Sequence, residues 1–185
     1  GDVAGKGLPA PLLKCMFQAA LQALCEMGLP PEETISRLNR LLCRRLPPNR
    51  FVTFFFGVLD PARHTLTYVN AGQNPPCRLG SDDAIDRLTA TGPPLGLFAG
   101  AAFTARTFEL APGDLVLCFS DGATEGRSAS DEEFGEERLI NIVRQSRGEK
   151  PEEIVHRATS AVEQHSAASP RQDDTTLVVL TRRDR

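Results

Sequence analysis

The sequence predicts an α/β sandwich, in which two antiparallel β-sheets pack on each other and pairs of helices cover their outer faces. Two helical patterns open the chain, and two more follow most of a central block of strand patterns. Several strand segments are apolar on both faces, as in a sheet that is covered above and below. Short hairpin connections between them argue against a parallel sheet. Two packed sheets with helices outside them satisfy both observations.

The helices are indicated by apolar residues that recur at spacings of three and four. Gly28 is expected to end the first helix, because glycine readily takes the left-handed conformation found at helix ends. The second helix begins at one Pro-Pro pair and ends before another. The four expected helices are Leu8–Met27, Pro30–Leu46, Glu136–Arg147 and one that begins at Pro151.

The strands are indicated by short apolar segments that lie between turn residues. A turn at Asp60–His64 is expected to join the first two strands into an antiparallel hairpin. The first, sixth and last strands are apolar on both faces and are expected to be buried on both. The seven expected strands are Phe51–Leu59, Thr65–Val69, Pro76–Leu79, Ile85–Leu88, Phe103–Leu110, Leu115–Phe119 and Thr175–Leu180.

The composition is typical of one globular domain, which we expect to span residues 1–185. Hydrophobic residues make up 41% of the chain and charged residues 24%, which excludes a disordered or fibrous protein. The net charge of −3 and the pI near 5.7 give no electrostatic reason to expect nucleic acid or an anionic membrane as a partner. No apolar run approaches the ~20 residues of a membrane span.

The five cysteines are odd in number, scattered, and form no CxxC pair. This pattern indicates free thiols in a reducing cytoplasm rather than a disulfide framework or a zinc site. Cys15, Cys25 and Cys43 fall within expected helices, and Cys118 falls within an expected buried strand. We therefore expect core thiols at these four positions.

Acidic residues stand at the ends of two expected strands. Asp121 follows one strand, and Asp173 and Asp174 directly precede the last one. If these strands are antiparallel neighbours, Asp121 and Asp173 meet at one edge of the sheet. Asp2 lies in a glycine-flanked turn before the first helix. Converging carboxylates favour a bound hard cation, and a set of oxygen ligands favours magnesium or manganese over zinc.

Other interpretations of these segments remain open on spacing alone. Aspartates beside glycines are also common in ordinary turns. The glycine-rich segment Gly1–Gly7 is not a P-loop, because its spacer is one residue short and Gly7 replaces the Ser or Thr that holds magnesium. Gly5–Ala10 fits the dinucleotide-binding pattern GxGxxA, but hairpins rather than a βαβ unit follow it.

Five segments, taken together, resemble the metal-dependent serine/threonine phosphatases of the PP2C superfamily, in the SpoIIE/RsbU branch. The branch has the motifs GDVxGxGxxA, NAGHNPP, GxPLG, SDGxxE and DDxT, and this chain carries their counterparts in the same order, nearly from end to end. The matching segments are Gly1–Ala10 (GDVAGKGLPA), Asn70–Pro76 (NAGQNPP), Gly92–Gly96 (GPPLG), Ser120–Glu125 (SDGATE) and Asp173–Thr176 (DDTT).

The resemblance implies a PP2C-like αββα sandwich with a metal centre at one edge of the central sheets. Asp2 would bridge two Mn²⁺ or Mg²⁺ ions, and the backbone carbonyl of Val3 would bind the second ion. Asp121 and Asp173 would complete the protein ligands of the first ion, whereas Asp174 would support them as a polar neighbour. The ions would activate a water that attacks the phosphorus of a phosphoserine or phosphothreonine.

The chain departs from the family pattern in two places. Gln73 stands where the family usually has His, so any proton donation from that side chain would be absent. The family also carries one or two strands before the GDV motif, including an acidic ligand of the second metal, and this sequence begins after them. We therefore expect N-terminal strands to be missing here. A fragment of this extent should bind at most one well-ordered ion, show little turnover, and pair its open edge with a second copy as a homodimer.

The resemblance also implies partners and a cellular role. The substrate would be a phosphorylated anti-anti-sigma (STAS-like) protein, and the domain would be the output end of a cytoplasmic bacterial signalling protein with an upstream sensor or receiver domain. Neither nucleic acid nor a membrane is expected to contact it. The alternative is a catalytically degenerate PP2C-like module that acts by binding a regulatory partner.

Overall fold

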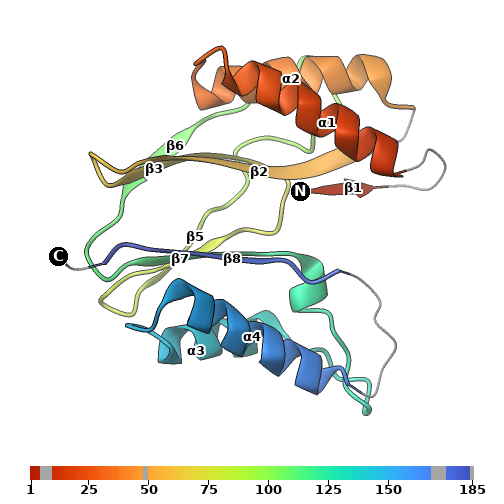
Figure 1. Cartoon of the computed structure of the whole chain (residues 1–185). Helices are drawn as coiled ribbons and strands as arrows, with labels where there is room; N and C mark the ends of the chain where they lie inside the picture. Colours follow the sequence, from red (N-terminus) through yellow and green to blue (C-terminus); the bar gives the residue numbers. More distant parts are fainter. Residues whose placement is uncertain (5–9, 48–49, 168–173, 184–185) are drawn as a thin grey trace. The chain divides into compact units, whose positions relative to one another are not determined.

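The structure, a computed structural model, describes residues 1–4, 10–47, 50–167 and 174–183, with residues 2–4, 10 and 11 described by their backbone. The chain forms two compact units. Unit 1 comprises residues 1–73 and 89–109, and unit 2 comprises residues 74–88 and 110–185. Each unit contains one four-stranded antiparallel sheet and one pair of helices (Figure 1).

In unit 1 both helices lie over the same face of the sheet (Figure 1). The strand order is β1-β2-β3-β6, and every neighbouring pair is antiparallel. The core lies between sheet and helices and includes Ile35, Leu38 and Leu42 of the second helix, all fully buried. The elements of unit 1 are β1 (Asp2–Ala4), α1 (Ala10–Cys25), α2 (Pro31–Arg45), β2 (Phe51–Asp60), β3 (Thr65–Ala71) and β6 (Arg106–Glu109).

Unit 2 has the same plan, with a second helix pair against its sheet (Figure 1). The strand order is β5-β4-β7-β8, again with antiparallel neighbours throughout. Its core includes Leu115 and Leu117 of the sheet and Leu139 and Ile154 of the helices. The elements are β4 (Cys77–Leu79), β5 (Ile85–Arg87), β7 (Leu115–Phe119), a 3₁₀ turn (Asp121–Ala123), α3 (Glu136–Gln145), α4 (Pro151–His165) and β8 (Leu177–Thr181).

The predicted fold class is confirmed: antiparallel sheets are each combined with a helix pair. The expected strand at Phe103–Leu110 is shorter than predicted, because Phe103 leaves the sheet and packs into the core of unit 1. One strand was not predicted. Residues Asp2–Ala4, expected to form a turn, pair with Phe51–Thr53 as β1.

Two expected buried strands are only partly buried. Val58 and Leu59 are exposed at the end of β2 that approaches the hairpin turn. Val178 is exposed in β8, which is the last strand of its sheet. An apolar sequence therefore continues beyond the covered part of each strand. No helix in the described part of the chain is long and apolar enough to cross a membrane.

The cysteines are free, but they are not all core thiols. Cys15 and Cys25 are exposed on α1, which corrects the sequence-based expectation. Cys77 is fully buried, whereas Cys43 and Cys118 are partly buried. Burial raises the pKa of the Cys77 thiol to about 12 and that of the Cys118 thiol to about 11.

A buried ion pair holds the middle of unit 2 together. The Asp114 carboxylate is fully buried and accepts hydrogen bonds from Arg78 Nε (2.8 Å), Ser81 N (3.0 Å) and Ala111 N (2.8 Å). These donors belong to β4, to the β4–β5 turn and to the turn before β7. Every bond that Asp114 makes therefore joins segments that are distant in sequence or that form a tight turn.

We expect the Asp114→Ala substitution to lower the free energy of unfolding by about 3 kcal/mol or more, because it removes the buried carboxylate that accepts from Arg78 and from two backbone N–H groups. Urea unfolding measures the loss. Glu132→Ala is the matched control, since Glu132 pairs with Arg138 at the surface and surface pairs contribute about 1 kcal/mol at most. Equal losses in the two variants would contradict the assignment.

We also expect the cysteines to differ in their reaction with iodoacetamide at pH 8. The thiolate is the reactive form, and the raised pKa keeps Cys77 protonated at this pH. Peptide mass spectrometry should find Cys15 and Cys25 alkylated and Cys77 unmodified. In 8 M urea all five should react. Alkylation of Cys77 in the folded protein at the rate of Cys15 would show the burial to be wrong.

Candidate functional site

Asp121 is placed by a sharp turn at the end of β7. The strand ends at Phe119, and Asp121 opens a 3₁₀ turn. One carboxylate oxygen, Asp121 Oδ1, accepts a hydrogen bond from Gly122 N (2.9 Å). The backbone carbonyl of Asp121 accepts hydrogen bonds from the backbone N–H groups of Thr124 and Glu125, both at 2.8 Å. Asp121 makes no ion pair within the described part of the chain, so its negative charge is not neutralised there.

Hydrogen bonds fasten this turn to the segment that precedes β8. Ser120 N donates to Thr176 O (3.0 Å), and Thr176 N donates to Ser120 Oγ (2.9 Å). Ser120 Oγ donates in turn to Asp174 O (3.1 Å), and Thr175 Oγ1 donates to Gly122 O (3.1 Å). We call this set of four bonds the SDG latch. The β7–β8 ladder confirms that the two strands are antiparallel neighbours, and the SDG latch places the SDG motif beside Asp174–Thr176.

In unit 1 a fully buried asparagine shapes the loop after β3. Asn70 Nδ2 donates to Gln73 O (3.1 Å), and Gln73 N donates to Asn70 Oδ1 (2.8 Å). Gln73 Oε1 accepts a hydrogen bond from Thr53 Oγ1 (2.9 Å). Thr53 is the cross-strand neighbour of Asp2. The loop that carries Gln73 therefore lies beside the strand that carries Asp2.

The link through Thr53 was missed at the level of sequence. Thr53 is the one polar residue in the segment Phe51–Leu59, and its position among apolar residues was the only available signal. In the structure its hydroxyl fixes the side chain that replaces the family's histidine. The orientation of Gln73 is thus set from β2 as well as from its own loop.

The predicted metal ligands are placed only in part. Asp121 is half-buried and Asp174 is exposed. Asp173 lies outside the described residues, and for Asp2 and Val3 only the backbone is described, in β1. Among the residues whose side chains the structure describes, no group of three or more acidic, histidine or cysteine side chains could hold a metal ion. The un-neutralised carboxylate of Asp121, with an oxygen-rich segment latched to it, fits a hard cation.

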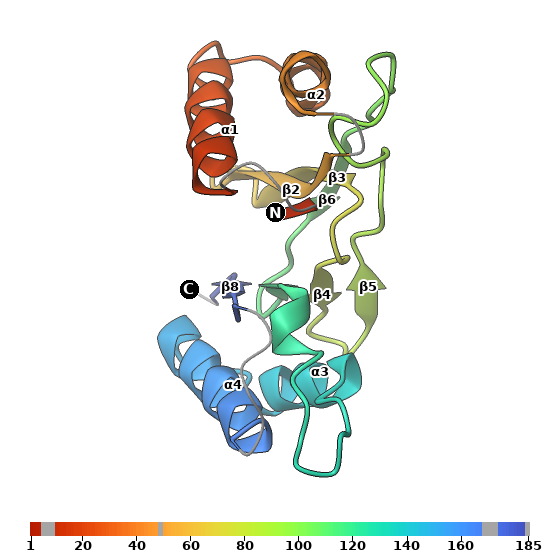
Figure 2. The same ribbon diagram turned by 90° about the vertical axis from the view of Figure 1, so that its right-hand side faces the viewer.

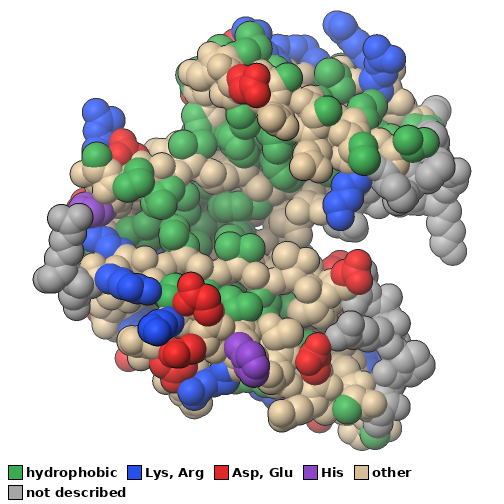
Figure 3. Space-filling model, in the orientation of Figure 1, with side chains coloured by type: hydrophobic (Ala, Val, Ile, Leu, Met, Phe, Trp, Pro, Cys, Tyr) green, Lys and Arg blue, Asp and Glu red, His purple; other side chains and the backbone are tan. Residues whose placement is uncertain are grey.

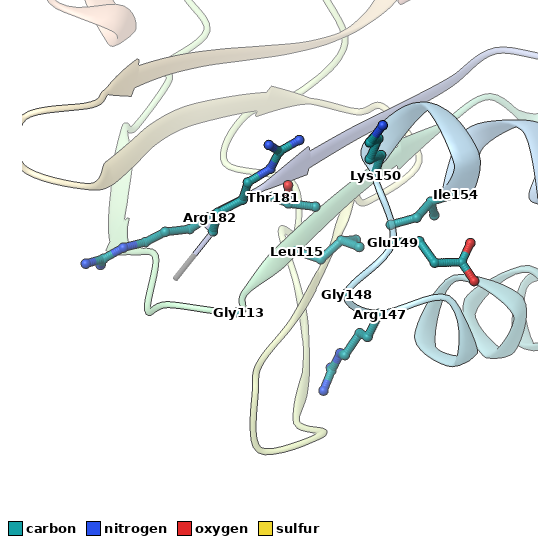
Figure 4. Close-up of a pocket in the computed structure, with 10 residues that line it drawn as sticks. Gly113, Leu115, Arg147, Gly148, Glu149, Lys150, Ile154, Thr181 and Arg182 are labelled. Atoms are coloured by element: carbon teal, nitrogen blue, oxygen red, sulfur yellow. The ribbon is translucent and has the colours of Figure 1, made fainter. Parts of the chain in front are cut away.

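Unit 2 also contains a cavity of about 370 Å³ (Figure 4). Leu115 and Thr181 line it, so it lies at the end of the β7–β8 pair opposite to Asp121. Lys150 and Arg147 on its wall point in different directions (Figure 4). The one acidic lining residue, Glu149, is paired with Arg157 at 2.7 Å. This cavity offers no converging carboxylates and does not contribute to the candidate metal site.

The sequence matches the model of one protein family over nearly its whole length. The matching family is described as Stage II sporulation protein E (SpoIIE), and the match covers residues 1–183. Protein IcfG of Synechocystis sp. is 27% identical over 98% of this chain and 33% of its own length. Phosphoserine phosphatase RsbU of Bacillus subtilis is 33% identical over 69% of this chain and 38% of its own length. The chain thus spans about a third of the length of these curated relatives.

Solved structures share the fold. The SiaA-PP2C domain of Pseudomonas aeruginosa is 18% identical and superposes with a TM-score of 0.82 over 99% of this chain and 74% of its own. The phosphatase domain of the cell fate determinant SpoIIE from Bacillus subtilis, from crystals presoaked with manganese, is also 18% identical. It gives a TM-score of 0.59 over 91% of this chain and 74% of its own. At these identities the likeness shows a PP2C fold.

We expect the Ser120→Ala substitution to open the SDG latch, since Ser120 Oγ both accepts from Thr176 and donates to Asp174. Amide hydrogen exchange at Thr176 should accelerate, and the free energy of unfolding should fall by roughly 1–2 kcal/mol. Ser128→Ala is the control, because Ser128 lies in an exposed turn beside Ser130. Unchanged exchange at Thr176 in Ser120→Ala would show that the latch does not hold this segment.

Proposed function

Because the chain belongs to the SpoIIE family of PP2C-type phosphatases, we propose that it is a metal-dependent serine/threonine protein phosphatase. Its substrate is a phosphoserine or phosphothreonine on a regulatory protein of the anti-anti-sigma type. One observation carries the proposal beyond family membership: the SDG latch brings the Asp121 turn against the DDTT motif. We further propose that both units, residues 1–185, act as one phosphatase domain.

The proposed ligands are those of the sequence motifs. Asp2, the Val3 carbonyl, Asp121 and Asp173 hold two Mn²⁺ or Mg²⁺ ions, and Asp174 supports them. Manganese was presoaked into crystals of a related SpoIIE domain, and the related protein RsbX was crystallised in complex with magnesium. When bound, such ions lower the pKa of a water and neutralise charge on the phosphoryl oxygens.

The chain's own residues position the reacting groups. The Gly122 N–H holds one oxygen of the Asp121 carboxylate and leaves the other without a hydrogen bond to a described residue. Since the SDG latch fixes the backbone on both sides of Asp121, little orientational freedom is left to lose on binding. Gln73 is neutral and is held by Thr53, so it can donate a hydrogen bond through its amide N but cannot act as an acid.

The partners follow from the same family membership. RsbU is a phosphoserine phosphatase by name, and we propose that this chain likewise binds a phosphorylated, STAS-like regulatory protein in the cytoplasm. Because the matches cover only 33% and 38% of the length of these curated relatives, we propose that an upstream sensor or receiver domain controls it. Pairing of two copies as a homodimer stays a prediction.

A non-enzymatic binding module is the second candidate. The replacement of the family's histidine by Gln73, whose side chain is already engaged by Thr53, is the observation that favours it. A binding module would need the fold and the SDG latch but not the charge of Asp121. The two candidates therefore predict different results for a substitution that removes the negative charge of Asp121 but keeps the shape of its side chain.

We expect the full-length protein to release phosphate from a serine-phosphorylated anti-anti-sigma protein only when manganese or magnesium is added. Asp121→Asn should lower kcat/KM by roughly 100-fold or more, because it removes a charged ligand. Asp131→Asn is the matched control, since Asp131 forms a surface pair with Arg127. Phosphate release is measured by phosphoprotein gel shift. Absence of metal-dependent release, with binding of the phosphoprotein retained, would favour the binding module instead.

A further inference from the structure

One aromatic side chain stands out on the surface of unit 1. Phe98 is 63% exposed, and its neighbour Leu97 is 40% exposed. They follow the GPPLG motif in the loop between β5 and β6, which Figure 2 shows beside α2, seen there end-on. Two adjacent apolar side chains in water are unfavourable by roughly 25 cal/mol per Å² of surface that could have been buried. Burial of such a pair by a partner would be favourable.

The backbone that carries this pair is fixed from beneath. Asn39 of α2 is fully buried, and its Nδ2 donates to Phe98 O (2.8 Å) while its Oδ1 accepts from Gly96 N (2.8 Å). The donor and the acceptor of one buried side-chain amide therefore both bind the backbone of residues 96–98. A buried amide that lost these bonds would cost about 1–3 kcal/mol, so the segment is held firmly to the helix.

The residues before the pair are equally constrained. Leu95 is fully buried and exchanges two backbone hydrogen bonds with Val52 of β2 (2.8 and 2.9 Å). Gly96 has a φ of 91°, and a Cβ there would lie 2.6 Å from the side chain of Leu46. The chain can pass this point close to α2 only because residue 96 is glycine. Phe98 is thus presented to solvent by a rigid support.

The helix that holds this segment carries positive charge on its exposed surface. No charged residue occurs between Thr89 and Ala105. On α2, Arg40 follows Asn39 directly and Arg44 lies one turn further on the same face, and both are exposed. Neither makes an ion pair within the described residues. Figure 3 shows Lys and Arg side chains along the top of unit 1, over α1 and α2, but the face that carries Leu97 and Phe98 is turned away in this view.

We propose that Leu97, Phe98, Arg40 and Arg44 form a docking patch for an acidic segment of the phosphoprotein substrate, with an apolar side chain of that segment packed on Phe98. Aromatic residues and arginine are the residue types that contribute most at protein interfaces. Pairing of two such patches would bring like charges together, which disfavours a second copy of this chain as the occupant. The inference rests on the proposed phosphatase function.

The test compares a protein substrate with a small one. Wild type, Phe98→Ala and Arg40→Glu, all as the full-length protein with manganese, are assayed on a serine-phosphorylated anti-anti-sigma protein and on p-nitrophenyl phosphate. We expect kcat/KM for the phosphoprotein to fall on the order of tenfold or more in both variants, mainly through KM. Activity on p-nitrophenyl phosphate, which is too small to reach a remote patch, should change by less than about twofold.

Two matched controls lie outside the patch. Met27→Ala removes an apolar side chain that is 55% exposed on the segment after α1. Arg63→Glu reverses a charge in the exposed β2–β3 turn. Both should leave kcat/KM for either substrate within about twofold of wild type. Higher salt should raise the KM for the phosphoprotein more in wild type than in Arg40→Glu, because one charge attraction is already lost in the variant.

Binding of the phosphoprotein is also measured by calorimetry without metal, so that docking is read independently of turnover. Loss of affinity in Phe98→Ala supports the patch even if no wild-type hydrolysis is found, and in that case the proposed function alone fails. Unchanged affinity and kcat/KM in both variants would overturn the patch. An equal fall on both substrates would also overturn it, since it would indicate a distorted active site. Retained phosphoprotein binding with altered response to a regulatory domain would assign the patch to that domain instead.

Discussion

Unit 2 depends on the pairing of β7 with β8. Five residue pairs join the strands, from Leu115 with Thr181 to Phe119 with Leu177. Because antiparallel neighbours end and begin at the same edge, this one ladder places the residue after β7 beside the residues before β8. The side chain of Ser120 then closes the gap between two backbone segments more than fifty residues apart. The geometry around Asp121 is a consequence of strand pairing more than of the turn itself.

Unit 1 is organised by two buried asparagines that serve the same physical purpose. Asn70 closes the loop that carries Gln73, and Asn39 holds the segment that carries Phe98. In each case one side-chain amide both donates to and accepts from a loop backbone. It thereby pairs backbone N–H and C=O groups that have no partner in a strand or helix. Each buried amide thereby ties the backbone of its loop to the strand or helix that carries it.

Much of this architecture is readable in the sequence, because apolar periodicity directly reports which face of an element is covered. The helices and the longer strands follow from it within a few residues. The strand Asp2–Ala4 cannot be predicted in this way, because three residues are too few to show an apolar periodicity. They form a strand only because Phe51–Thr53 pairs with them. The exposure of Cys15 and Cys25 was missed for a related reason: α1 is apolar around much of its surface, so its sequence does not say which side is free.

The candidate site divides in the same way. The resemblance to SpoIIE-type phosphatases located Asp121 and the DDTT motif, and strand pairing shows why those two motifs meet. Asp173 lies outside the described residues and stays a predicted ligand. The roles of Thr53 and Asn39 could not be predicted, because Thr53 acts through one hydrogen bond and Asn39 through two, all to residues at least twenty positions away. A single sequence contains no local trace of such a bond.

The path of the chain through the two units has a consequence for how the molecule is built. The chain passes between the units three times, at residues 73, 88 and 109. Every segment of unit 1 has left the ribosome once residue 109 has emerged, whereas unit 2 still lacks β7, both of its helices and β8. Since the edge of β7 gains its partner only with the last strand, it stays open to wrong partners until then. The half of the protein that carries Asp121 is the half that synthesis completes last.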